Sequence, residues 1–412
     1  MEKAPKSLRL HIGIFGRTNV GKSSFLNLVA GQDVAITSPQ PGTTTDVVEK
    51  TMELLPIGPV VFLDTAGLDD NSVLADLRLE KTNKVFDRSD VILLITTPNN
   101  WGEYEEKIIF ESEKRKIPFI IIINKSDLEE SSQEFLGTLN KACNRVIKCS
   151  SLSIENRDFT VNILKQYIID ICPEDFIQPP PLIGDLLKPK DMVVMIIPID
   201  FEAPKGRIIL PQVQAIRDTL DADACSIIVK ESEYVDTLNG LKNPPDLVVC
   251  DSQVVDRMVA ETPDNVKCTT FSILFSRYRG DLIEAVKGAA TIKNIKPNDK
   301  ILIAESCSHH AMEDDIGREK IPRWFKKYVG GDLQFDVCAG RDYPTNLKEY
   351  KLIIHCGGCM TNRREMLSRI QKAKESGVPI TNYGLCISYI KGVLERVLTP
   401  FPEALDVFKK MK

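Results

Sequence analysis

Two short segments in the C-terminal half of the chain combine cysteine with histidine at close spacing. Their sequences are Cys307-Ser308-His309-His310 and His355-Cys356-Gly357-Gly358-Cys359. Thiolates and imidazoles are the donors that zinc and iron-sulfur centres prefer. Where cysteines stay reduced, such clusters indicate metal binding or catalysis rather than disulfides. We therefore expect the two segments to contribute to a metal or iron-sulfur site.

A phosphate-binding loop lies near the start of the chain. Residues 16–23, Gly-Arg-Thr-Asn-Val-Gly-Lys-Ser, match the GxxxxGK[ST] pattern between an expected strand at 8–15 and an expected helix at 23–29. In this context the loop and the helix N-terminus donate backbone N–H groups to a β-phosphate. Lys22 is expected to contact the β- and γ-phosphates, and the Ser23 hydroxyl to ligate Mg²⁺. The residues of this region expected to bind the nucleotide are Gly16, Asn19, Val20, Gly21, Lys22, Ser23 and Ser24.

The expected strand at 60–63 leads into residues that suit Mg²⁺ and a γ-phosphate. Asp64 can hold Mg²⁺ through water, and Gly67 lets the backbone approach the phosphate. Leu68 then occupies the place where Ras-like enzymes carry a water-orienting glutamine, so we expect slow hydrolysis. A carboxylate of the following segment could orient the water instead. The candidates are Asp69, Asp70, Asp76 and Glu80, among which we favour Asp76, although any one of them could simply solvate a flexible switch.

Guanine recognition is predicted at the end of the expected strand at 118–123, where Asn124-Lys125-Ser126-Asp127 follows. The Asp127 carboxylate can accept from both the ring N–H and the exocyclic amine of guanine. Adenine places its donors differently, and a buried polar mismatch of this kind rejects an analogue by ~10⁴. The nucleotides are therefore predicted to be GTP and GDP. Ser150, Ser151 and Leu152 fit a loop that closes over the base, and a serine-rich turn is the alternative interpretation.

The composition of the 412-residue chain is that of a globular protein, with 43% hydrophobic residues. A net charge of −5 argues against nonspecific nucleic-acid binding, which needs a basic surface. The longest apolar runs, 91–95 and 119–123, have the length of strands rather than of membrane spans. We expect a cytoplasmic protein that binds neither nucleic acid nor membranes.

Alternating strands and helices predict an α/β fold with three domains. A P-loop GTPase domain at 1–172 is followed by a Pro-rich linker at 173–190 and by two smaller parallel-sheet domains at 191–270 and 271–412. The expected strands of the smaller domains are 192–199, 226–229, 247–250, 301–304, 333–337, 352–355 and 378–381. The expected helices are 210–220, 234–241, 253–261, 280–295 and 362–376. The middle domain shows no catalytic constellation, which makes it a candidate for self-association.

The strand order of the last domain brings the cysteine segments together. Cys307 follows its first expected strand, Cys338 ends the second, and residues 355–359 follow the third. Because the carboxyl ends of parallel strands meet at one edge of a sheet, we expect Cys307, Cys356 and Cys359 to form one three-thiolate site. Two chemistries remain open, a structural zinc with one histidine and a four-iron cluster with one open iron. The candidates for the fourth position are His309, His355, Glu305 and Asp314.

The first third of the chain resembles the GTPase branch that includes the tRNA-modifying GTPase MnmE and the ribosome-assembly GTPase Era. The resemblance rests on the phosphate-binding loop with Asn19 and on Pro41-Gly-Thr-Thr-Thr-Asp46. It implies that Thr44 senses and ligates Mg²⁺. It also implies that Asn19 holds a K⁺ ion against the phosphates, so that K⁺ stimulates hydrolysis.

The two cysteine segments, downstream of such a GTPase domain, resemble those of the [FeFe]-hydrogenase maturation GTPases, the HydF family. Residues 203–217 also resemble that family's middle domain, so the similarity covers the whole chain. The resemblance implies a dimeric scaffold that binds a [4Fe-4S] cluster through three cysteines and transiently holds the diiron precursor of the hydrogenase H-cluster. The implied partners are two radical S-adenosylmethionine maturases and the apo-hydrogenase, and GTP hydrolysis would regulate these encounters.

Two other classes of protein compete with this interpretation. One is a ribosome- or tRNA-directed GTPase with a zinc-bound accessory domain. The negative net charge of the chain and the absence of a GXXG RNA-binding loop both argue against it. The other is a GTP-switched adaptor whose metal site only stabilises the fold.

Overall fold

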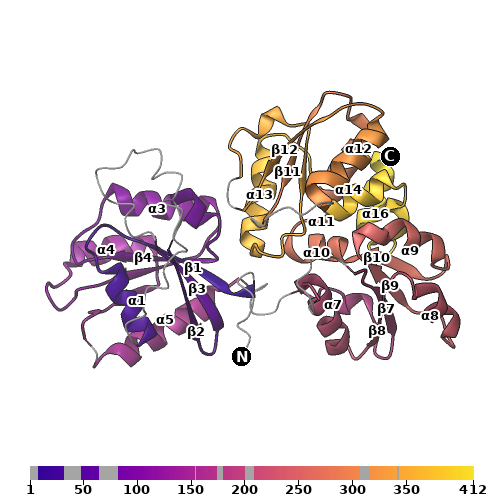
Figure 1. The fold of residues 1–412 in the computed structure, drawn as a ribbon. Helices are drawn as coiled ribbons and strands as arrows, with labels where there is room; N and C mark the ends of the chain where they lie inside the picture. The colour runs from indigo at the N-terminus through magenta and orange to yellow at the C-terminus, as the bar shows by residue number, and fades with distance from the viewer. Residues whose placement is uncertain are drawn as a thin grey trace. The chain divides into compact units, whose positions relative to one another are not determined.

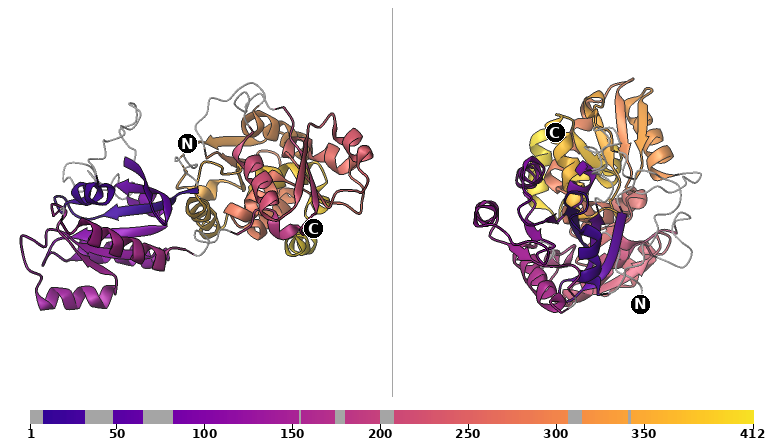
Figure 2. Two further views of the ribbon diagram at one scale, coloured as in Figure 1. Left: turned by 90° about the horizontal axis from the view of Figure 1, so that it is seen from below. Right: turned by 90° about the vertical axis from the view of Figure 1, so that its left-hand side faces the viewer.

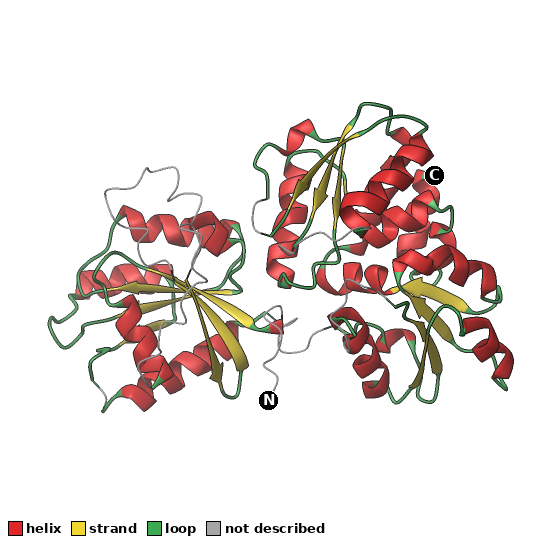
Figure 3. Ribbon diagram, in the orientation of Figure 1, coloured by secondary structure: helices red, strands yellow, loops and turns green. Residues whose placement is uncertain are grey.

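The computed structural model describes residues 8–31, 48–64, 82–153, 155–173, 180–199, 208–306, 315–340 and 343–412. The chain divides into two compact units, Met1–Pro179 and Pro180–Lys412. Figures 1 and 2 show the fold of each unit, and Figure 3 shows that helices and strands alternate in both. The predicted α/β class is therefore confirmed.

The first unit contains a six-stranded sheet in the order β2-β3-β1-β4-β5-β6. β2 and β3 are antiparallel, and the other neighbours are parallel. The strands are β1 (Leu10–Phe15), β2 (Val48–Leu54), β3 (Gly58–Asp64), β4 (Val91–Thr96), β5 (Phe119–Ile123) and β6 (Val146–Lys148). The central strands β1 and β4 are buried at every residue, which explains their largely apolar sequences.

Helices cover both faces of this sheet. Side chains of α1 (Lys22–Ala30) and α5 (Arg157–Ile171) share a core with one face of β1. Side chains of α3 (Glu103–Lys114) and α4 (Gln133–Ala142) pack in the cores of the opposite face. The result is the three-layer fold of a P-loop GTPase, with β1 leading through the phosphate-binding loop into α1 as predicted.

The second unit contains two four-stranded parallel sheets, with the orders β10-β9-β7-β8 and β12-β11-β13-β14. The strands of the first are β7 (Met192–Ile196), β8 (Cys225–Val229), β9 (Leu247–Cys250) and β10 (Lys267–Thr270). Those of the second are β11 (Lys300–Ala304), β12 (Gln334–Cys338), β13 (Leu352–His355) and β14 (Ile380–Asn382). Two parallel sheets after the GTPase domain agree with the predicted fold class.

One hydrophobic core joins the two sheets of the second unit. Buried side chains of β7 and β9 belong to the same cluster as those of β11, β13 and the helices between the sheets. The helices of this unit are α7 (Leu210–Asp221), α8 (Tyr234–Gly240), α9 (Val255–Glu261), α10 (Phe271–Arg279), α11 (Leu282–Ala290), α12 (Ile321–Val329), α13 (Arg363–Glu375), α14 (Tyr383–Ile390), α15 (Leu394–Val397) and α16 (Pro402–Met411). The segments 191–270 and 271–412 therefore fold around common apolar contacts.

The structure differs from the predicted elements at the junction of these segments. α10 follows β10 directly, because the Thr270 side chain accepts from Ile273 N and caps the helix where the strand ends. The helix predicted at 280–295 is α11, which ends at Ala290 and continues as a 3₁₀ turn at Thr291–Asn294. The strand predicted at 192–199 ends at Ile196, before Pro198, which has no N–H to donate.

Candidate functional site

The phosphate-binding loop has backbone conformations that its glycines make possible. Gly16 and Gly21 have φ angles of 154° and 91°, and Asn19 has a φ of 64°. A Cβ atom on Gly16 would lie 2.3 Å from Ile95 O, and one on Gly21 would lie 2.3 Å from Asn124 Nδ2. The two glycines of the motif are therefore required by close contacts as well as by their dihedral angles.

The lysine of the loop is held over the loop's own backbone. Lys22 is 7% exposed, and its Nζ donates to Gly16 O at 2.5 Å and to Arg17 O at 3.0 Å. Ser23, the expected Mg²⁺ ligand, is exposed in the first turn of α1, and Ser24 is half-buried. Asp64 is 4% exposed at the end of β3.

An ion pair that the sequence motif does not contain also anchors the loop. Arg17 Nε and Nη2 donate to the two carboxylate oxygens of Glu105 at 2.8 and 2.7 Å. Glu105 is fully buried in the first turn of α3 and also accepts from Gly102 N at 3.1 Å. Two parallel N–H···O bonds fix direction as well as distance, so α3 orients the start of the loop.

Asn124 joins three of the predicted nucleotide-binding segments. Its Nδ2 donates to Val20 O at 2.9 Å, and its Oδ1 accepts from Ser151 N at 2.9 Å and from Ser151 Oγ at 2.7 Å. The phosphate-binding loop, residues 124–127 and residues 150–152 thus meet at one edge of the sheet. Asp127 is exposed, and Leu152 has 81% of its surface exposed. Ser150 is half-buried. The backbone of Lys125 has a φ of 58°.

Gly21→Ala is expected to weaken GTP binding by about fivefold or more. The added methyl group would collide with Asn124 Nδ2, and a φ of 91° strains any residue with a Cβ by about 1–3 kcal/mol. A cost of that size, carried by the binding site, corresponds to about fivefold or more in affinity. Nucleotide titration by fluorescence or calorimetry measures the effect.

Gly137→Ala is the matched control, because a Cβ there has no neighbour within 4 Å. Gly137 lies inside α4, where alanine stabilises a helix by about 0.5–1 kcal/mol relative to glycine. Equal GTP affinities of the two variants would contradict the role given to Gly21.

Several predicted site residues lie outside the described residues. In the first unit these are Thr44, Gly67 and Asp76, together with the other acids proposed to orient water, Asp69, Asp70 and Glu80. In the second unit they are Cys307, His309 and Asp314.

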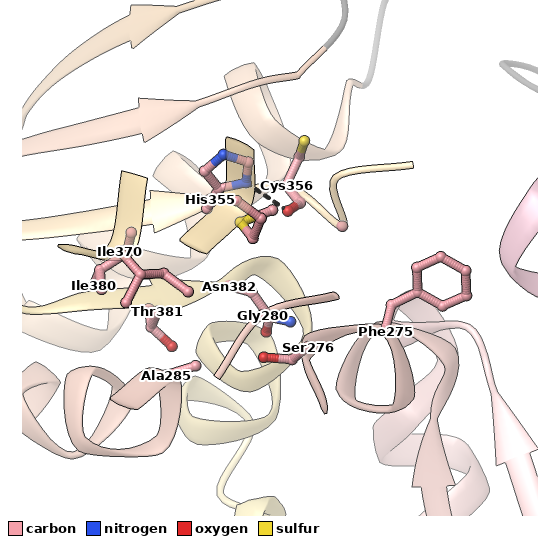
Figure 4. Close-up of a pocket in the computed structure, with 12 residues that line it drawn as sticks. Phe275, Ser276, Gly280, Ala285, His355, Cys356, Ile370, Ile380, Thr381 and Asn382 are labelled. Carbon is pink, nitrogen blue, oxygen red and sulfur yellow. Dashed lines mark hydrogen bonds between the residues drawn. The ribbon is translucent and has the colours of Figure 1, made fainter. Parts of the chain in front are cut away.

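The described residue that precedes the first cysteine segment lies against the second segment, at the carboxyl edge of the second sheet of the second unit. β11 and β13 are parallel neighbours with Ala304 opposite His355. Ser306, which directly precedes Cys307, donates its backbone N–H to Cys356 Sγ at 3.1 Å, and the Cys356 thiol donates to Ser306 Oγ at 3.4 Å. Figure 4 shows His355 and Cys356 at the end of β13.

A tight turn separates Cys356 from Cys359. Gly358 has a φ of 66°, and Thr361 closes the turn by donating from its N and Oγ1 to Gly358 O at 3.2 and 3.0 Å. Both cysteines are half-buried. Burial, followed by the nearby Cys356 thiol, raises the pKa of Cys359, and the guanidinium of Arg279 opposes this change.

His355 uses both ring nitrogens in hydrogen bonds. It is 2% exposed, its Nδ1 lies 2.8 Å from Cys356 O, and its Nε2 lies 3.0 Å from Nη1 of Arg369. Since the carbonyl only accepts and the guanidinium only donates, the ring is neutral with its proton on Nδ1. Burial, and then the charge of Arg369, lower the pKa of His355 to about 3. Figure 4 shows the bond to the Cys356 carbonyl.

Arg369 connects the ends of two strands around the cysteine segments. Its Nη2 donates to Gly340 O at 2.7 Å, just beyond β12, and to Glu365 Oε1 at 3.0 Å. Arg369 is 4% exposed on α13, and Glu365 neutralises its charge. Asn362 caps this helix by accepting from Glu365 N, whereas the Glu365 side chain binds Arg369.

Glu305, another candidate ligand at this edge, already has a partner, and Cys338 is a partly buried thiol. Glu305 is 3% exposed and pairs with Arg318 at 2.7 Å. Cys338 ends β12, and burial raises the pKa of its thiol to about 11. Within the described ranges, no three of the His, Cys, Asp and Glu side chains are grouped so that they could hold a metal ion.

A small cavity lies behind the cysteine turn, between α10, α13 and the end of β14 (Figure 4). Its volume is ≈ 30 Å³, about that of one water molecule. Thr381 lines it, and its Oγ1 is buried and has no hydrogen-bond partner among the described residues. The cavity has room for a solvent molecule, but an iron-sulfur cluster is much larger.

Family models match three successive parts of the chain. The model of the 50S ribosome-binding GTPase matches residues 11–125. The models of the hydrogen maturase F dimerization and tetramerization domains match residues 182–280 and 283–400. The last two together cover more than half of the 412 residues. Their descriptions indicate that this part of the chain self-associates.

Curated relatives match mainly the GTPase portion. The tRNA modification GTPase MnmE of Prochlorococcus marinus (strain NATL1A) is 33% identical over 160 residues, which are 38% of this chain and 34% of that protein. The GTPase Era of Thermoanaerobacter sp. (strain X514) is 27% identical over 230 residues, 52% of this chain and 73% of that protein. The chain thus spans about a third of the length of this MnmE relative.

Among solved structures, a variant of Era from Aquifex aeolicus bound to GDP.AlF4- aligns with 53% of this chain and 93% of its own, at 23% identity and a TM-score of 0.32. The family model and the relatives, together with the phosphate-binding loop, identify the first unit as a P-loop domain that binds and hydrolyses GTP. Among the described helices, none combines the length and apolar character that crossing a membrane requires.

Proposed function

Because the chain belongs to the hydrogen maturase F family, we propose that it is a GTP-hydrolysing scaffold that binds a [4Fe-4S] cluster and delivers the diiron subcluster to an apo-[FeFe]-hydrogenase. The observation that carries the proposal is the contact between Ser306 and Cys356. Ser306 N donates to Cys356 Sγ, so the residue that precedes Cys307 touches the first cysteine of the Cys-x-x-Cys turn.

The proposed cluster ligands are the thiolates of Cys307, Cys356 and Cys359. The donor set fits an iron-sulfur cluster, because Cys356 and Cys359 flank a glycine turn and Cys356 Sγ already accepts a backbone N–H. When bound, the cluster supplies an iron open to an exchangeable ligand, at which the diiron precursor is held as cargo. A structural zinc would instead close all four positions.

The hydrogen bonds of His355 argue for a positioning role in this site. Both ring nitrogens are engaged, one by the Cys356 carbonyl and one by Arg369. We propose that His355 fixes the orientation of the Cys356 peptide, which aims the thiol toward Ser306. His309 and Asp314, which lie outside the described residues, are then the side chains left for the fourth position.

The proposed role of the first unit is to control the encounters of the scaffold with its partners. These are two radical S-adenosylmethionine maturases upstream, the apo-hydrogenase downstream, and a second copy of the chain. Asn19, exposed on the phosphate-binding loop, is proposed to hold K⁺, while Ser23 and Thr44 ligate Mg²⁺. The fast, glutamine-oriented hydrolysis of Ras-like enzymes is not needed for such a switch, which agrees with Leu68.

Anaerobic reconstitution with iron and sulfide tests the proposal. We expect a brown protein with iron and acid-labile sulfide in equal amounts, near four of each per chain for a four-iron cluster. Its EPR spectrum after reduction should be that of a [4Fe-4S]⁺ centre. A colourless protein that retains zinc and binds no sulfide would contradict cluster binding and favour a metal that only stabilises the fold.

A further inference from the structure

Arg279 is a buried cation beside the cysteine turn. It is the last residue of α10 and is 2% exposed. Its Nη1 donates to Thr361 O at 2.7 Å, and its guanidinium carbon lies 5.7 and 5.6 Å from the ring centres of Phe275 and Tyr278. Burying a guanidinium is costly unless nearby groups compensate for the lost hydration, and the carbonyl and the two aromatic faces contribute to that compensation.

The position of Arg279 relates it directly to the turn. Thr361, whose carbonyl accepts from Arg279, closes the turn through its two bonds to Gly358 O. Thr361 lies only two residues after Cys359, so the bond to its carbonyl anchors the guanidinium close to this cysteine in the chain. Arg279 therefore holds one end of the turn and places a positive charge beside Cys359.

The other buried arginine of this region has a different role. Arg369 is neutralised by Glu365 at 3.0 Å and binds His355 and Gly340, so it crosslinks strand ends. Arg279 instead binds the carbonyl of Thr361, which closes the turn that carries Cys359, one of the proposed cluster ligands. Arg369 is thus a structural crosslink, whereas Arg279 places its charge next to the turn that carries a proposed ligand.

We propose that Arg279 is the electrostatic partner of the cluster, a positioning residue whose charge stabilises the thiolate-bound cluster and raises its reduction potential. The inference rests on the proposed function. Three thiolates outweigh the positive charge of the oxidised cluster core, and reduction adds one more electron. A fixed cation therefore favours the reduced state more than the oxidised state, and in a site of low dielectric the effect is large.

Two substitutions separate the charge of Arg279 from its hydrogen bond. Arg279→Lys keeps the charge, whereas Arg279→Gln keeps a donor for Thr361 O and removes the charge. After reconstitution, an EPR-monitored redox titration is expected to show a wild-type potential for Arg279→Lys and a more negative potential for Arg279→Gln. Iron and sulfide content, measured on the same samples, reports loading.

Arg277→Gln is the matched control on the same helix. Arg277 lies two residues earlier and binds Asp185 and the carbonyls of Pro181 and Leu182, away from the turn. Its substitution should leave the potential unchanged. A shift in this variant equal to that of Arg279→Gln would assign the effect to α10 as a whole and overturn the proposal.

The remaining outcomes also decide the question. Loading that survives in Arg279→Lys and fails in Arg279→Gln would support the role of the charge. A wild-type potential in Arg279→Gln, or loss of the cluster in Arg279→Lys, would overturn it and leave Arg279 a purely geometric role. A wild-type protein that binds no cluster would contradict the proposed function itself, which is a different result from a loaded protein whose potential ignores Arg279.

Discussion

Asp127→Asn is expected to weaken GTP binding by about 10⁴-fold. The proposed carboxylate accepts from two guanine donors, and an amide in its place turns one of these contacts into a donor facing a donor. Sites built to match a polar edge reject a mismatched partner by about this factor. The same amide suits xanthine, which carries an oxygen where guanine carries its exocyclic amine, so the variant should bind xanthosine triphosphate better than GTP.

Competition between the two nucleotides for a fluorescent analogue measures this exchange of preference. Glu130→Gln is the control, because Glu130 is an exposed carboxylate three residues away. It removes the same charge without altering base recognition. If Asp127→Asn kept the affinity of the wild type for GTP, the assignment of guanine recognition to Asp127 would be wrong.

Cys356→Ser is expected to lose most of its bound iron and sulfide. Loss of an outer hydrogen bond to a metal ligand costs roughly 10–100-fold in affinity, so loss of a thiolate ligand should cost at least about 100-fold. The substitution is nearly isosteric, and serine can still hydrogen bond to Ser306, so the fold should tolerate it. Iron and sulfide content after reconstitution measures the effect, and thermal unfolding of the unreconstituted protein checks the fold.

Cys338→Ser provides the control at the same edge of the sheet. Cys338 is half-buried at the end of β12 and is not one of the three proposed ligands. It should retain wild-type iron. The proposed ligand set would be refuted by the opposite pattern, in which Cys356→Ser keeps its cluster and Cys338→Ser loses it.

The sequence alone was sufficient to predict the structure where a motif requires particular elements beside it. The phosphate-binding loop needs a strand before it and a helix after it, and β1 and α1 occupy these places. Parallel order likewise predicted that the ends of β11 and β13 are neighbours, and the bond between Ser306 and Cys356 shows this contact. These predictions depend on neighbouring residues or on strand order, both of which a sequence contains.

Contacts between distant helices and the cysteine turn could not be predicted in this way. Arg369 and Arg279 belong to helices, and a sequence pattern only shows that an arginine is present, not that its guanidinium is buried against a particular carbonyl. The protonation of the two ring nitrogens of His355 could be assigned only from the structure, which shows that Arg369 contacts Nε2. α10 was missed because it begins where β10 ends, so no turn residues mark the boundary.

The shared core of the second unit was hidden for a related reason. Alternating apolar elements predict that a sheet has buried faces, but they do not specify which other element covers each face. Phe275 of α10 and Val286 of α11 belong to the same core as strands of both sheets, so the two segments on either side of residue 271 share apolar contacts.

This shared core has a consequence for assemblies of the chain. It fixes the distance between any surface of residues 182–280 and the turn that carries Cys356 and Cys359. In a symmetric assembly built through that surface, the symmetry operation alone then sets the separation between the turns of two copies. That separation can change only if the copies shift against each other or the core opens, so the spacing of the proposed cargo sites would be a property of the assembly geometry.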